Sequence, residues 1–558
     1  MGLCDFCFSG EENQIVKKYI IPKKIILTKG TKNSEYLLAD FPRQSTLGKA
    51  KVCIFEKGEY VLLDFGSELQ GGVDITVKSV KVGNEKIRGC GRLRIVFGES
   101  VSEALSNIGG EKNAQNEHST RDMSVVTTSW STMRYGNTGF RFVKIESEEG
   151  IIEISAIKGV LEYRDIAYKG SFRCNDERLN RIFDTAAYTV HLNMQDYIWD
   201  GIKRDRLVWM GDMHPEVSTI CSVFGYNESV EKSLDFARDS FPVSDSKPVW
   251  ITFPSYTCWW ITIQWEWYMQ NGRLDYLLEQ KAYMYNVCEN LIKSIGEDGE
   301  IFISENFFFV DWSSAESHYA EAGFRGCIII ALESASKIFE VYKDSKMSER
   351  CLNIVKNIKK KVPDFSGNKQ ICAMAALSGL CDMKTAEKII TKDLLCGLST
   401  FYGYYVLRAL SKAGNIQAAI DILRGYWGAM LDLGATTFWE DFDIEWTKNA
   451  GRIDEPLCDG KIDIHGTYGK HCYIKLRLSL CHGWASGPAD FISKNILGVE
   501  ILEPGCRKVR ISPKLGDLVW VKGTYPTPYG VIEIEHRKAD GKIESKITAP
   551  KGVTFIKE

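Results

Sequence analysis

Three aspartates, three cationic side chains and an indole crowd one short segment of the chain, DGIKRDRLVWMGDMHPE at residues 200–216. Asp200, Asp205 and Asp212 are five and seven residues apart, and these spacings match no single face of a helix. Only a folded loop can bring the three carboxylates together. Their mutual repulsion is then relieved by a neighbouring arginine or by protonation of one carboxyl group. The segment therefore has the groups for a proton donor and a proton acceptor, the pair that general acid–base chemistry requires.

Trp209 lies inside this segment and offers either an apolar wall that raises the pKa of a carboxyl group or a flat surface for a sugar ring. The alternative is a solvated turn in which Arg204 and Arg206 simply pair with Asp200 and Asp205. Surface ion pairs of that kind are common and contribute little to stability. Other parts of the chain decide between the two interpretations.

A second acidic segment, GATTFWEDFD at residues 434–443, places Glu440 directly after Trp439. Three further stretches set aromatic side chains beside polar groups where helices are interrupted: CWW at 258–260, FFFVDWSS at 307–314 and LCHGWASGP at 480–488. Any one of them is typical of a helix-bundle core. Together they indicate a carbohydrate cleft.

The elements that must position these residues fall into three regions. Between about Lys17 and Asp165, short runs alternate with period two between Gly, Asn and Ser turns, which predicts an antiparallel β-sandwich or jelly roll. From Cys174 onward apolar residues recur at helical spacing, with Asn175 as the N-cap. After Gly498 the strand pattern returns, with PTPYG as a hairpin turn.

The helical segments stand in pairs joined by Gly, Asn or Asp turns, which is typical of an array of helical hairpins. Such pairs close into a barrel or extend as an open solenoid, and the absence of a fixed sequence period favours the barrel. We predict a multidomain α and β protein. Its regions are an N-terminal β-sandwich domain at 1–168, a helical catalytic domain at 169–497 and a small C-terminal β-sandwich domain at 498–558.

The 200–216 segment falls between a helix that ends near Tyr197 and a helix that begins near Pro215. A rigid scaffold holds such a loop at the mouth of a cleft. Glu216 lies in the first turn of the second helix, where the helix dipole favours a carboxylate without any catalytic role. It is nevertheless the reserve candidate for the proton donor.

Residues 200–212 resemble the signature D-x-P-x-R-E-R-x-x-W-x-G-D of the inverting α-L-rhamnosidases of glycoside hydrolase family 78, which are six-hairpin glycosidases. The matching residues are Asp200, Arg204, Arg206, Trp209, Gly211 and Asp212. GATTFWED is similar to the A-T-T-x-W-E element of that family, and CHGWASG is similar to its N-H-Y-A-F-G-S element. The resemblance implies β-sandwich domains around an (α/α)6 barrel. It also implies an exo-acting hydrolase that releases terminal α-L-rhamnose from oligosaccharides or glycosides.

The resemblance assigns a role to each matching residue. Asp205 is the general acid, and Glu440 is the general base that activates water. The sugar is held by Asp200, Arg204, Trp209 and Asp212, with His482 nearby. For inversion the two catalytic carboxyl groups stand roughly 6.5–9.5 Å apart. The methyl group of rhamnose suits an aromatic pocket drawn from Trp259, Trp260, Phe308 or Trp312, with Trp439 beside the base.

The chain departs from the family pattern in several places. Position 205 is Asp where the pattern has Glu, which shortens the acid by one methylene, and Ile202 replaces the usual Pro. The residues after Asp212 also differ. The interval of 42 residues from Glu440 to His482 implies an inserted loop near the cleft, so the type of glycosidic bond is better supported than the aglycone.

Two other functions fit parts of the pattern. One is another (α/α)-barrel hydrolase or a polysaccharide lyase with a different sugar specificity, because a fold does not fix the substrate. The other is a sugar-binding relative without catalysis, an interpretation motivated by the shorter acid at Asp205. His318 either lines the cleft or packs between helices.

Metal and redox chemistry have weak candidates. Cys4 and Cys7 have the spacing of a metal or redox pair, but no second pair follows at ligand spacing. His465 and His471, with Asp463, are further candidate ligands, and a solvated mobile loop is the commoner arrangement for such histidines. We expect neither a metal nor a cofactor.

Composition sets the class of protein. The chain has 558 residues, 44% hydrophobic and 26% charged, which is typical of a soluble folded protein of two or three domains. A net charge of -3 without a long basic run argues against nucleic acid as a partner. The 17 scattered cysteines predict free thiols in a reducing compartment. With neither a signal-peptide pattern nor a membrane-spanning run, we expect a cytoplasmic protein without a membrane partner, and homo-oligomerisation is left open.

Overall fold

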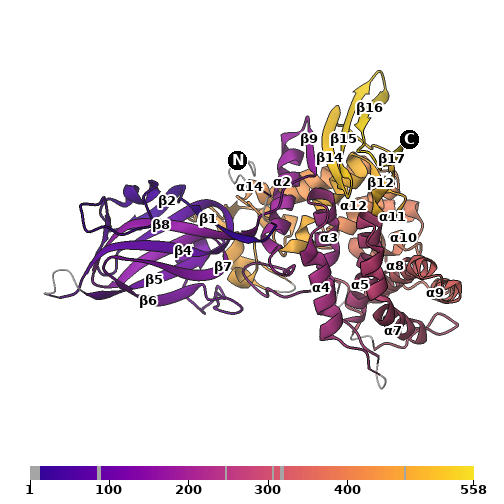
Figure 1. Cartoon of the computed structure of the whole chain (residues 1–558), viewed down its shortest axis with the longest axis horizontal. Helices are drawn as coiled ribbons and strands as arrows, with labels where there is room; N and C mark the ends of the chain where they lie inside the picture. Colours follow the sequence, from indigo (N-terminus) through magenta and orange to yellow (C-terminus); the bar gives the residue numbers. More distant parts are fainter. Residues whose placement is uncertain are drawn as a thin grey trace.

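The computed structural model describes residues 10, 13–83, 89–244, 248–304, 307–314, 319–470 and 473–557. Figure 1 shows a β region at one end of the molecule, a body of helices beside it, and a second set of strands packed over the helices. The coarse prediction of a multidomain α and β protein is therefore confirmed. Cys4, Cys7, His318 and His471 lie outside the described residues.

The N-terminal strands join in one antiparallel sheet in the order β1-β8-β4-β7-β5-β6, with β2 paired to β4 and β3 paired to β8. They are β1 (Ile15–Ile20), β2 (Lys24–Lys29), β3 (Cys53–Phe55), β4 (Tyr60–Lys81), β5 (Cys90–Gly98), β6 (Asp122–Thr128), β7 (Ser131–Glu149) and β8 (Ile151–Arg164). The ladder between β4 and β7 shifts register around Gly71, whose φ is 141°. A Cβ atom there would lie 2.1 Å from the carbonyl oxygen of Val160, so the strands approach closely only because this residue is glycine.

The helices form an inner and an outer layer. The inner helices are α3 (Met213–Val223), α5 (Pro254–Asn271), α8 (Ala320–Val341), α10 (Lys369–Leu377), α12 (Gly403–Lys412) and α16 (Gly487–Phe491), which continues as η8 (Ile492–Ile496). Each of these contacts the next along the chain, and α16 contacts α3, so the inner helices close a ring within the described residues.

The outer helices are α2 (Glu177–Asn193), α4 (Glu228–Ser240), α6 (Leu274–Glu279), α7 (Lys281–Lys293), α9 (Ser345–Ile358), α11 (Met383–Thr391), α13 (Ile416–Ile422), η4 (Leu423–Trp427) and α14 (Gly428–Asp432). The two layers differ in sequence pattern. Inner helix α5 carries large apolar side chains all round and is buried, whereas outer helix α9 buries one face that includes Met347, Cys351 and Val355.

Helix α2 begins one residue later than its sequence pattern suggests. The side chain of Asp176 accepts hydrogen bonds from the backbone N–H groups of Arg178 and Leu179, so Asp176 and not Asn175 is the N-cap. The Asn175 side chain instead accepts hydrogen bonds from the backbone of Val519 and Trp520. The predicted cap was wrong because its amide belongs to a contact with the distant C-terminal strands.

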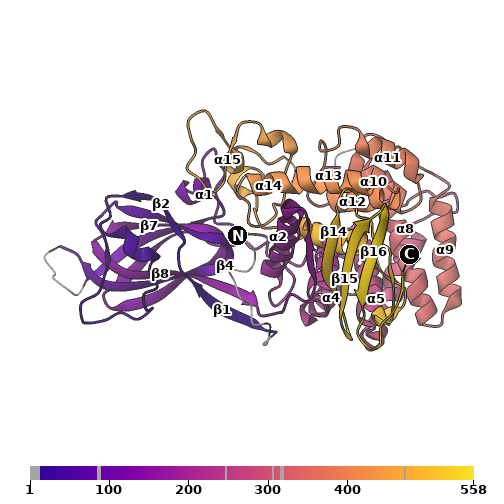
Figure 2. The same ribbon diagram turned by 90° about the horizontal axis from the view of Figure 1, so that it is seen from above.

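The C-terminal strands form two small sheets, β12-β13-β17 and β16-β15-β14-β9. They are β12 (Val499–Ile501), β13 (Lys508–Ile511), β14 (Trp520–Thr527), β15 (Gly530–Ala539), β16 (Lys542–Thr548) and β17 (Thr554–Lys557). Strand β9 (Ser171–Cys174) comes from just before the helices and pairs antiparallel with β14. Figure 2 shows β14, β15 and β16 lying side by side over the helices. The chain thus ties the start of the helical region to the C-terminal sheet.

Within the described residues, none of the helices is both long enough and apolar enough to cross a membrane. The described cysteines are free thiols, and most of them, including Cys221 and Cys327, are buried.

Candidate active site

The start of the 200–212 loop is fixed by backbone contacts with the segment that starts at Leu480. Gly201 forms a β-bridge with His482, and the N–H of Gly483 donates to the carbonyl of Asp200 at 2.7 Å. The Asp200 carboxylate turns back into its own loop and accepts the N–H of Leu207 at 2.9 Å. These bonds fold the loop so that residues that a helix or strand would hold far apart lie in one site.

Arg204 lies between the two predicted catalytic acids. Its guanidinium donates a hydrogen bond to Oε2 of Glu440, and another of its nitrogens lies 3.6 Å from Oδ1 of Asp205. Because the terminal nitrogens of a guanidinium are only about 2.3 Å apart, the nearest carboxylate oxygens of the two acids are separated by no more than about 9 Å. This limit includes the spacing that inversion requires.

Glu440 is buried and held from several sides. The backbone N–H of Ser479 donates to its Oε2 at 3.0 Å, on the same oxygen that Arg204 contacts. The Glu440 carbonyl accepts the hydroxyl of Thr400 at 2.6 Å and the indole N–H of Trp484 at 3.0 Å. Side chain and backbone are therefore fixed together.

Three segments converge on the Asp205 carboxylate, whose side chain is 14% exposed. Trp209 of the same loop donates from its indole N–H at 3.2 Å, and the Tyr473 hydroxyl donates at 3.1 Å. Nε2 of His118, from the loop between β5 and β6, lies 3.6 Å away. The Tyr473 ring also lies 3.4 Å from the centre of the Arg204 guanidinium. The inserted loop thus reaches both charged groups.

The solvated turn is excluded by the contacts of the two arginines. Arg204 is buried against Glu440, and Arg206 donates to the backbone and side-chain oxygens of Asn137 at 2.9 and 3.0 Å. Asp200 forms no hydrogen bond with either arginine within the described structure. The charged groups of the loop therefore contribute to a buried site.

Asp200, Asp212 and His482 form a second, deeper group. Oδ1 of Asp212 lies 3.2 Å from Nε2 of His482, and Tyr256 donates to Oδ2 of Asp212 at 3.1 Å. Burial raises the pKa of Asp200 well above its ordinary value, although His482 opposes this shift. Burial also raises the pKa of Asp212. For His482, burial lowers the pKa, but the hydrogen bond to Asp212 and the charge of Glu440 outweigh it, so the pKa is raised.

Glu216, the reserve candidate for the acid, lies fully buried in α3. Neither of its carboxylate oxygens has a hydrogen-bond partner among the described residues. Burial raises its pKa well above the ordinary value, and the charges of Asp212 and Asp200 raise it further. A Cβ atom on Gly483 would lie 1.5 Å from Oε1 of Glu216, so this glycine is required for the carboxyl to fit. Burial therefore favours the protonated form of Glu216, which is packed beneath the site.

The predicted aromatic pocket is only partly assembled. Ring contacts connect Trp312 to Phe309 at 5.1 Å, Phe309 to Tyr256 at 5.9 Å, and Tyr256 to Trp209 at 6.1 Å. This row ends at Asp205 and Asp212, because Trp209 and Tyr256 are their donors. Trp312 is 39% exposed, so its ring is available to a ligand.

Other predicted aromatic residues are not brought to the acids. Trp260 is fully buried, donates its indole N–H to the carbonyl of Leu234 in α4 at 3.2 Å, and packs against Tyr283. Its assignment to the sugar pocket is corrected, since its contacts are those of a core residue.

Three further aromatic candidates occupy other places. Trp259 stacks on His214 and lines a separate cavity. Phe308 stacks on Phe324 of α8. Trp439 is buried edge-on against Phe442, next to the base.

The sequence did not single out two acids beside the site, the buried Asp311 and the half-buried Asp441. Asp311 accepts the hydroxyls of Ser313 at 2.9 Å and Ser399 at 2.6 Å. Asp441 accepts the N–H of Lys470, and burial raises its pKa to about 6. Both stand directly beside residues that the sequence did single out, Trp312 and Glu440. Only the fold shows which distant residues contact them.

Behind the catalytic loop, the Lys203 ammonium joins several segments. Its Nζ lies 2.9 Å from a carboxylate oxygen of Glu99 and 3.3 Å from one of Glu103. It also donates to the carbonyls of Leu476 at 3.1 Å and Leu478 at 2.5 Å. Glu99 directly follows β5 and Glu103 lies in α1 (Val101–Leu105), so this junction, named here the Lys203 junction, fastens the 200–212 loop to the N-terminal strands.

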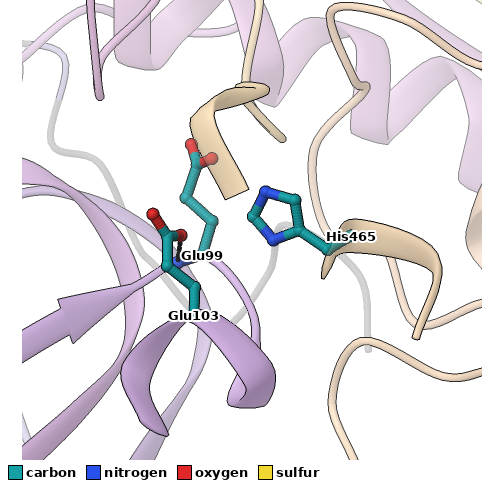
Figure 3. Close-up of side chains that lie close together, drawn as sticks. All are labelled: Glu99, Glu103 and His465. Atoms are coloured by element: carbon teal, nitrogen blue, oxygen red, sulfur yellow. Dashed lines mark hydrogen bonds between the residues drawn. The ribbon is translucent and has the colours of Figure 1, made fainter. Parts of the chain in front are cut away.

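Figure 3 shows Glu99, Glu103 and His465 pointing toward one another, a set of donor groups that resembles a cation site. The Lys203 ammonium already contacts both carboxylates. Both ring nitrogens of His465 are also engaged, with Ser100 at 2.8 Å and with the carbonyl of Leu478 at 3.0 Å, and burial lowers its pKa to about 4. The cluster fits an ion-paired junction and not a metal centre. The expectation that His465 is solvated was wrong.

The inserted loop contains η5 (Ile444–Thr447), β10 (Ala450–Gly451), β11 (Ile462–Asp463), α15 (Ile464–Thr467) and η6 (Lys475–Arg477). Helix α15 contacts α1 of the N-terminal domain. Asp463 caps α15 through the N–H of Gly466 and pairs with Lys112 at 2.7 Å. Asp463 is thus engaged in local structure.

Comparisons with known proteins agree with this architecture. Residues 167–327 match the family described as the bacterial alpha-L-rhamnosidase 6 hairpin glycosidase domain, and residues 498–556 match the bacterial alpha-L-rhamnosidase C-terminal domain. An alpha-L-rhamnosidase of Formosa agariphila is 31% identical over 86 residues, which are 15% of this chain and 9% of that protein. The matched part is thus a small fraction of that relative.

Solved structures show the same fold at low identity. The GH78 rhamnosidase of Bacillus sp. GL1 superposes with a TM-score of 0.71 at 19% identity, over 94% of this chain and 55% of that one. The Klebsiella oxytoca rhamnosidase with rhamnose bound gives a TM-score of 0.67 at 18% identity, over 86% and 96% of the two chains. The chain spans about half the length of the Bacillus protein and nearly all of the Klebsiella protein.

Proposed function

We propose that this chain, which belongs to the bacterial α-L-rhamnosidases of glycoside hydrolase family 78, hydrolyses terminal α-L-rhamnosides with inversion at the anomeric carbon. The observation that carries the proposal is the position of Arg204, whose guanidinium contacts Glu440 and lies 3.6 Å from Asp205. One cation thereby holds two carboxylates from distant segments close to each other, within the upper limit of the separation that inversion requires.

The proposed mechanism divides the work between the two acids. Asp205 donates a proton to the leaving oxygen, and Glu440 removes a proton from the attacking water on the opposite face of the sugar. Arg204 and the N–H of Ser479 both contact Oε2 of Glu440, so we assign Oε1 to the water. The hydroxyls of the sugar are held by Asp200, Arg204, Asp212 and His482, while Trp209 and Trp312 supply aromatic surface.

The finer architecture belongs to the same proposal. The closed ring of inner helices and the outer helices that alternate with them support an (α/α)6 barrel as the catalytic domain. The N-terminal strands then form a β-sandwich and the C-terminal strands a small sandwich that borrows β9. A cytoplasmic location is also proposed, on the odd number of 17 cysteines.

A sugar-binding protein without hydrolysis is the second candidate. Its support is Asp205, which is shorter than the glutamate of the family pattern and is contacted by both Trp209 and Tyr473. Binding of rhamnose without turnover, unchanged in Asp205→Asn, would favour this candidate.

The deciding experiment incubates the purified chain with an aryl α-L-rhamnoside and follows the released sugar by NMR. We expect β-L-rhamnose to appear first and the α-anomer to grow in by mutarotation. Asp205→Asn provides the matched control, because it keeps the shape of the side chain and removes the acidic proton. Release of the α-anomer first would reject inversion, and absence of turnover would reject hydrolysis.

A further inference from the structure

A hollow of about 910 Å³ lies inside the ring of helices, at the end remote from the acids. The inner helices α3 and α5 begin beside the acids, at Asp212 and Tyr256, and their later residues line this hollow. Strands β12 and β13 of the C-terminal domain form its rim. We name it the basal cavity.

Positive charge exceeds negative charge around the basal cavity. Among the described residues that line it, the cationic side chains are Lys337, Arg408, Lys412, Lys494, Arg510 and Lys514. The acidic side chains that line it are Glu266, Glu333 and Glu500. A cavity with this excess attracts anions, and the low-dielectric walls strengthen that attraction.

The acids of the cavity are already paired with other groups. Glu500 pairs with Arg510 at 2.7 Å, Glu333 with Lys359 at 3.5 Å, and Glu266 with His214 at 3.2 Å. Their negative charges are therefore partly compensated, and the charges of Lys494 and Arg408 also act on Glu266.

Arg408 has no direct hydrogen-bond or ion-pair partner among the described residues. Its guanidinium lies 5.4 Å from the Tyr404 ring and 6.0 Å from the Tyr405 ring, and the more distant charges of Glu266 and Asp490 act on it. An arginine presents five N–H donors in a rigid fork that matches the oxygens of a phosphate or carboxylate. A half-buried guanidinium without a direct partner is suited to bind such a group.

Two further groups of the cavity wall suit a small polar ligand. Ser218 is buried, with 3% of its surface exposed, and its hydroxyl has no hydrogen-bond partner among the described residues. Trp265 contributes a half-buried indole, a flat surface on which a ring can stack. Pockets that combine aromatic walls with a few polar groups are typical of small-molecule sites.

We propose that the basal cavity binds a small molecule that carries an oxyanion, either a phosphate or a carboxylate, through the guanidinium of Arg408. Lys412 adds positive charge, Lys494 is paired with Asp490 at 2.9 Å, and Ser218 offers one more hydrogen bond. The site is separate from the acids at Asp205 and Glu440, and binding there does not require hydrolysis. A negative result for anion binding is therefore distinguishable from a negative result for the proposed glycosidase activity.

Calorimetric titration of the full chain tests this proposal. The probes are inorganic phosphate, a hexose phosphate and a hexuronate, with the neutral hexose as the control ligand. We expect at least one oxyanion probe to bind and the neutral hexose not to bind. The hexose phosphate and the hexuronate distinguish the two sources of negative charge. Absence of binding by all three anions would overturn the proposal.

Substitutions assign the binding to the cavity. Arg408→Gln should lower the affinity for the anion by at least about tenfold, the effect of losing a charge-assisted hydrogen bond. Arg408→Lys should retain part of the affinity. Lys388→Gln removes the same charge from the exposed face of α11 and should change nothing. Lys412→Gln, at an exposed rim position, tests the site without altering a buried group. Equal affinity in Arg408→Gln, Lys412→Gln and Lys388→Gln would refute the assignment.

Discussion

Arg204 donates a hydrogen bond to the carboxylate of Glu440, 236 residues further along the chain, and both side chains are buried. The contact joins the loop before α3 to the segment after α14, and it places the proposed base against a permanent cation. A buried carboxylate without such a partner would carry a large desolvation cost. Orientation of the base and stability of the site thus depend on the same contact.

Replacing Arg204 with glutamine should lower kcat on an aryl α-L-rhamnoside by about 100-fold, since an oriented charged donor in a buried site contributes on that scale. Arg204→Lys keeps the charge but not the fork that spans Glu440 and Asp205, so it should recover only a small part. Arg206→Gln is the matched control, because Arg206 contacts Asn137 and neither acid. Comparable losses in Arg204→Gln and Arg206→Gln would contradict the assigned role.

The division between acid and base can be tested with leaving groups. Asp205→Asn and Glu440→Gln should each reduce turnover by at least about two orders of magnitude, the contribution of positioned proton transfer. A phenol of low pKa leaves without protonation, so it should rescue Asp205→Asn far more than Glu440→Gln. Equal losses with every leaving group would show that Asp205 is not the proton donor.

Glu216 makes the free energy of unfolding depend on pH. Its pKa in the folded chain is raised by burial above the unfolded value near 4.3, so the folded chain keeps a proton that the unfolded chain releases. The stabilising contribution of the protonated Glu216 is fully present below about pH 4. It is lost as the pH rises through the pKa of Glu216 in the folded chain.

The glutamine of Glu216→Gln resembles the protonated carboxyl group, so the variant should not lose this stability as the pH rises. Urea unfolding should find the variant more stable than the parent near pH 7, with the difference shrinking toward about pH 4. Glu228→Gln is the control, because Glu228 lies at the surface beside Lys232 and its pKa is lowered by that contact. A destabilised Glu216→Gln at neutral pH would mean that the folded carboxyl is ionised.

The Lys203 junction should be essential to the folded chain. Lys203→Met removes the ammonium group from the buried carboxylates of Glu99 and Glu103, although Arg121 still lies 3.7 Å from Glu103, and such a change costs about 3–5 kcal/mol in comparable sites. Lys112→Met, at the half-exposed pair with Asp463, should cost about 0–1 kcal/mol. Adding Glu99→Gln to Lys203→Met should recover part of the loss, because it removes one uncompensated charge. Additive losses in the double variant would contradict direct pairing.

The sequence predicted the order of the β, helical and β regions, because strand and helix periodicities depend on neighbouring residues. It also predicted that Asp200, Asp205 and Asp212 share a folded loop, since no regular element could bring them together. It did not predict contacts made at long range. Asn175 contacts the C-terminal strands instead of capping α2, and β9 joins the sheet of β14.

The aromatic residues show the same limit. Local composition cannot distinguish the core tryptophan Trp260 from the exposed Trp312, because both stand in apolar runs beside polar residues. Asp311 and Asp441 were missed for a related reason, since contacts with the distant residues Ser399 and Lys470 are what make them part of the site.

Trp312 and Trp260 therefore provide a paired test of where the sugar binds. Trp312 is 39% exposed at the end of the aromatic row that leads to Trp209, so Trp312→Ala should raise KM while kcat changes little. Trp260→Phe removes the indole that donates to Leu234 in the core, so it should lower the melting temperature and leave KM unchanged. Steady-state kinetics and thermal unfolding of both variants separate the two effects. A raised KM in Trp260→Phe, with Trp312→Ala unaffected, would place the sugar at Trp260 and not at Trp312.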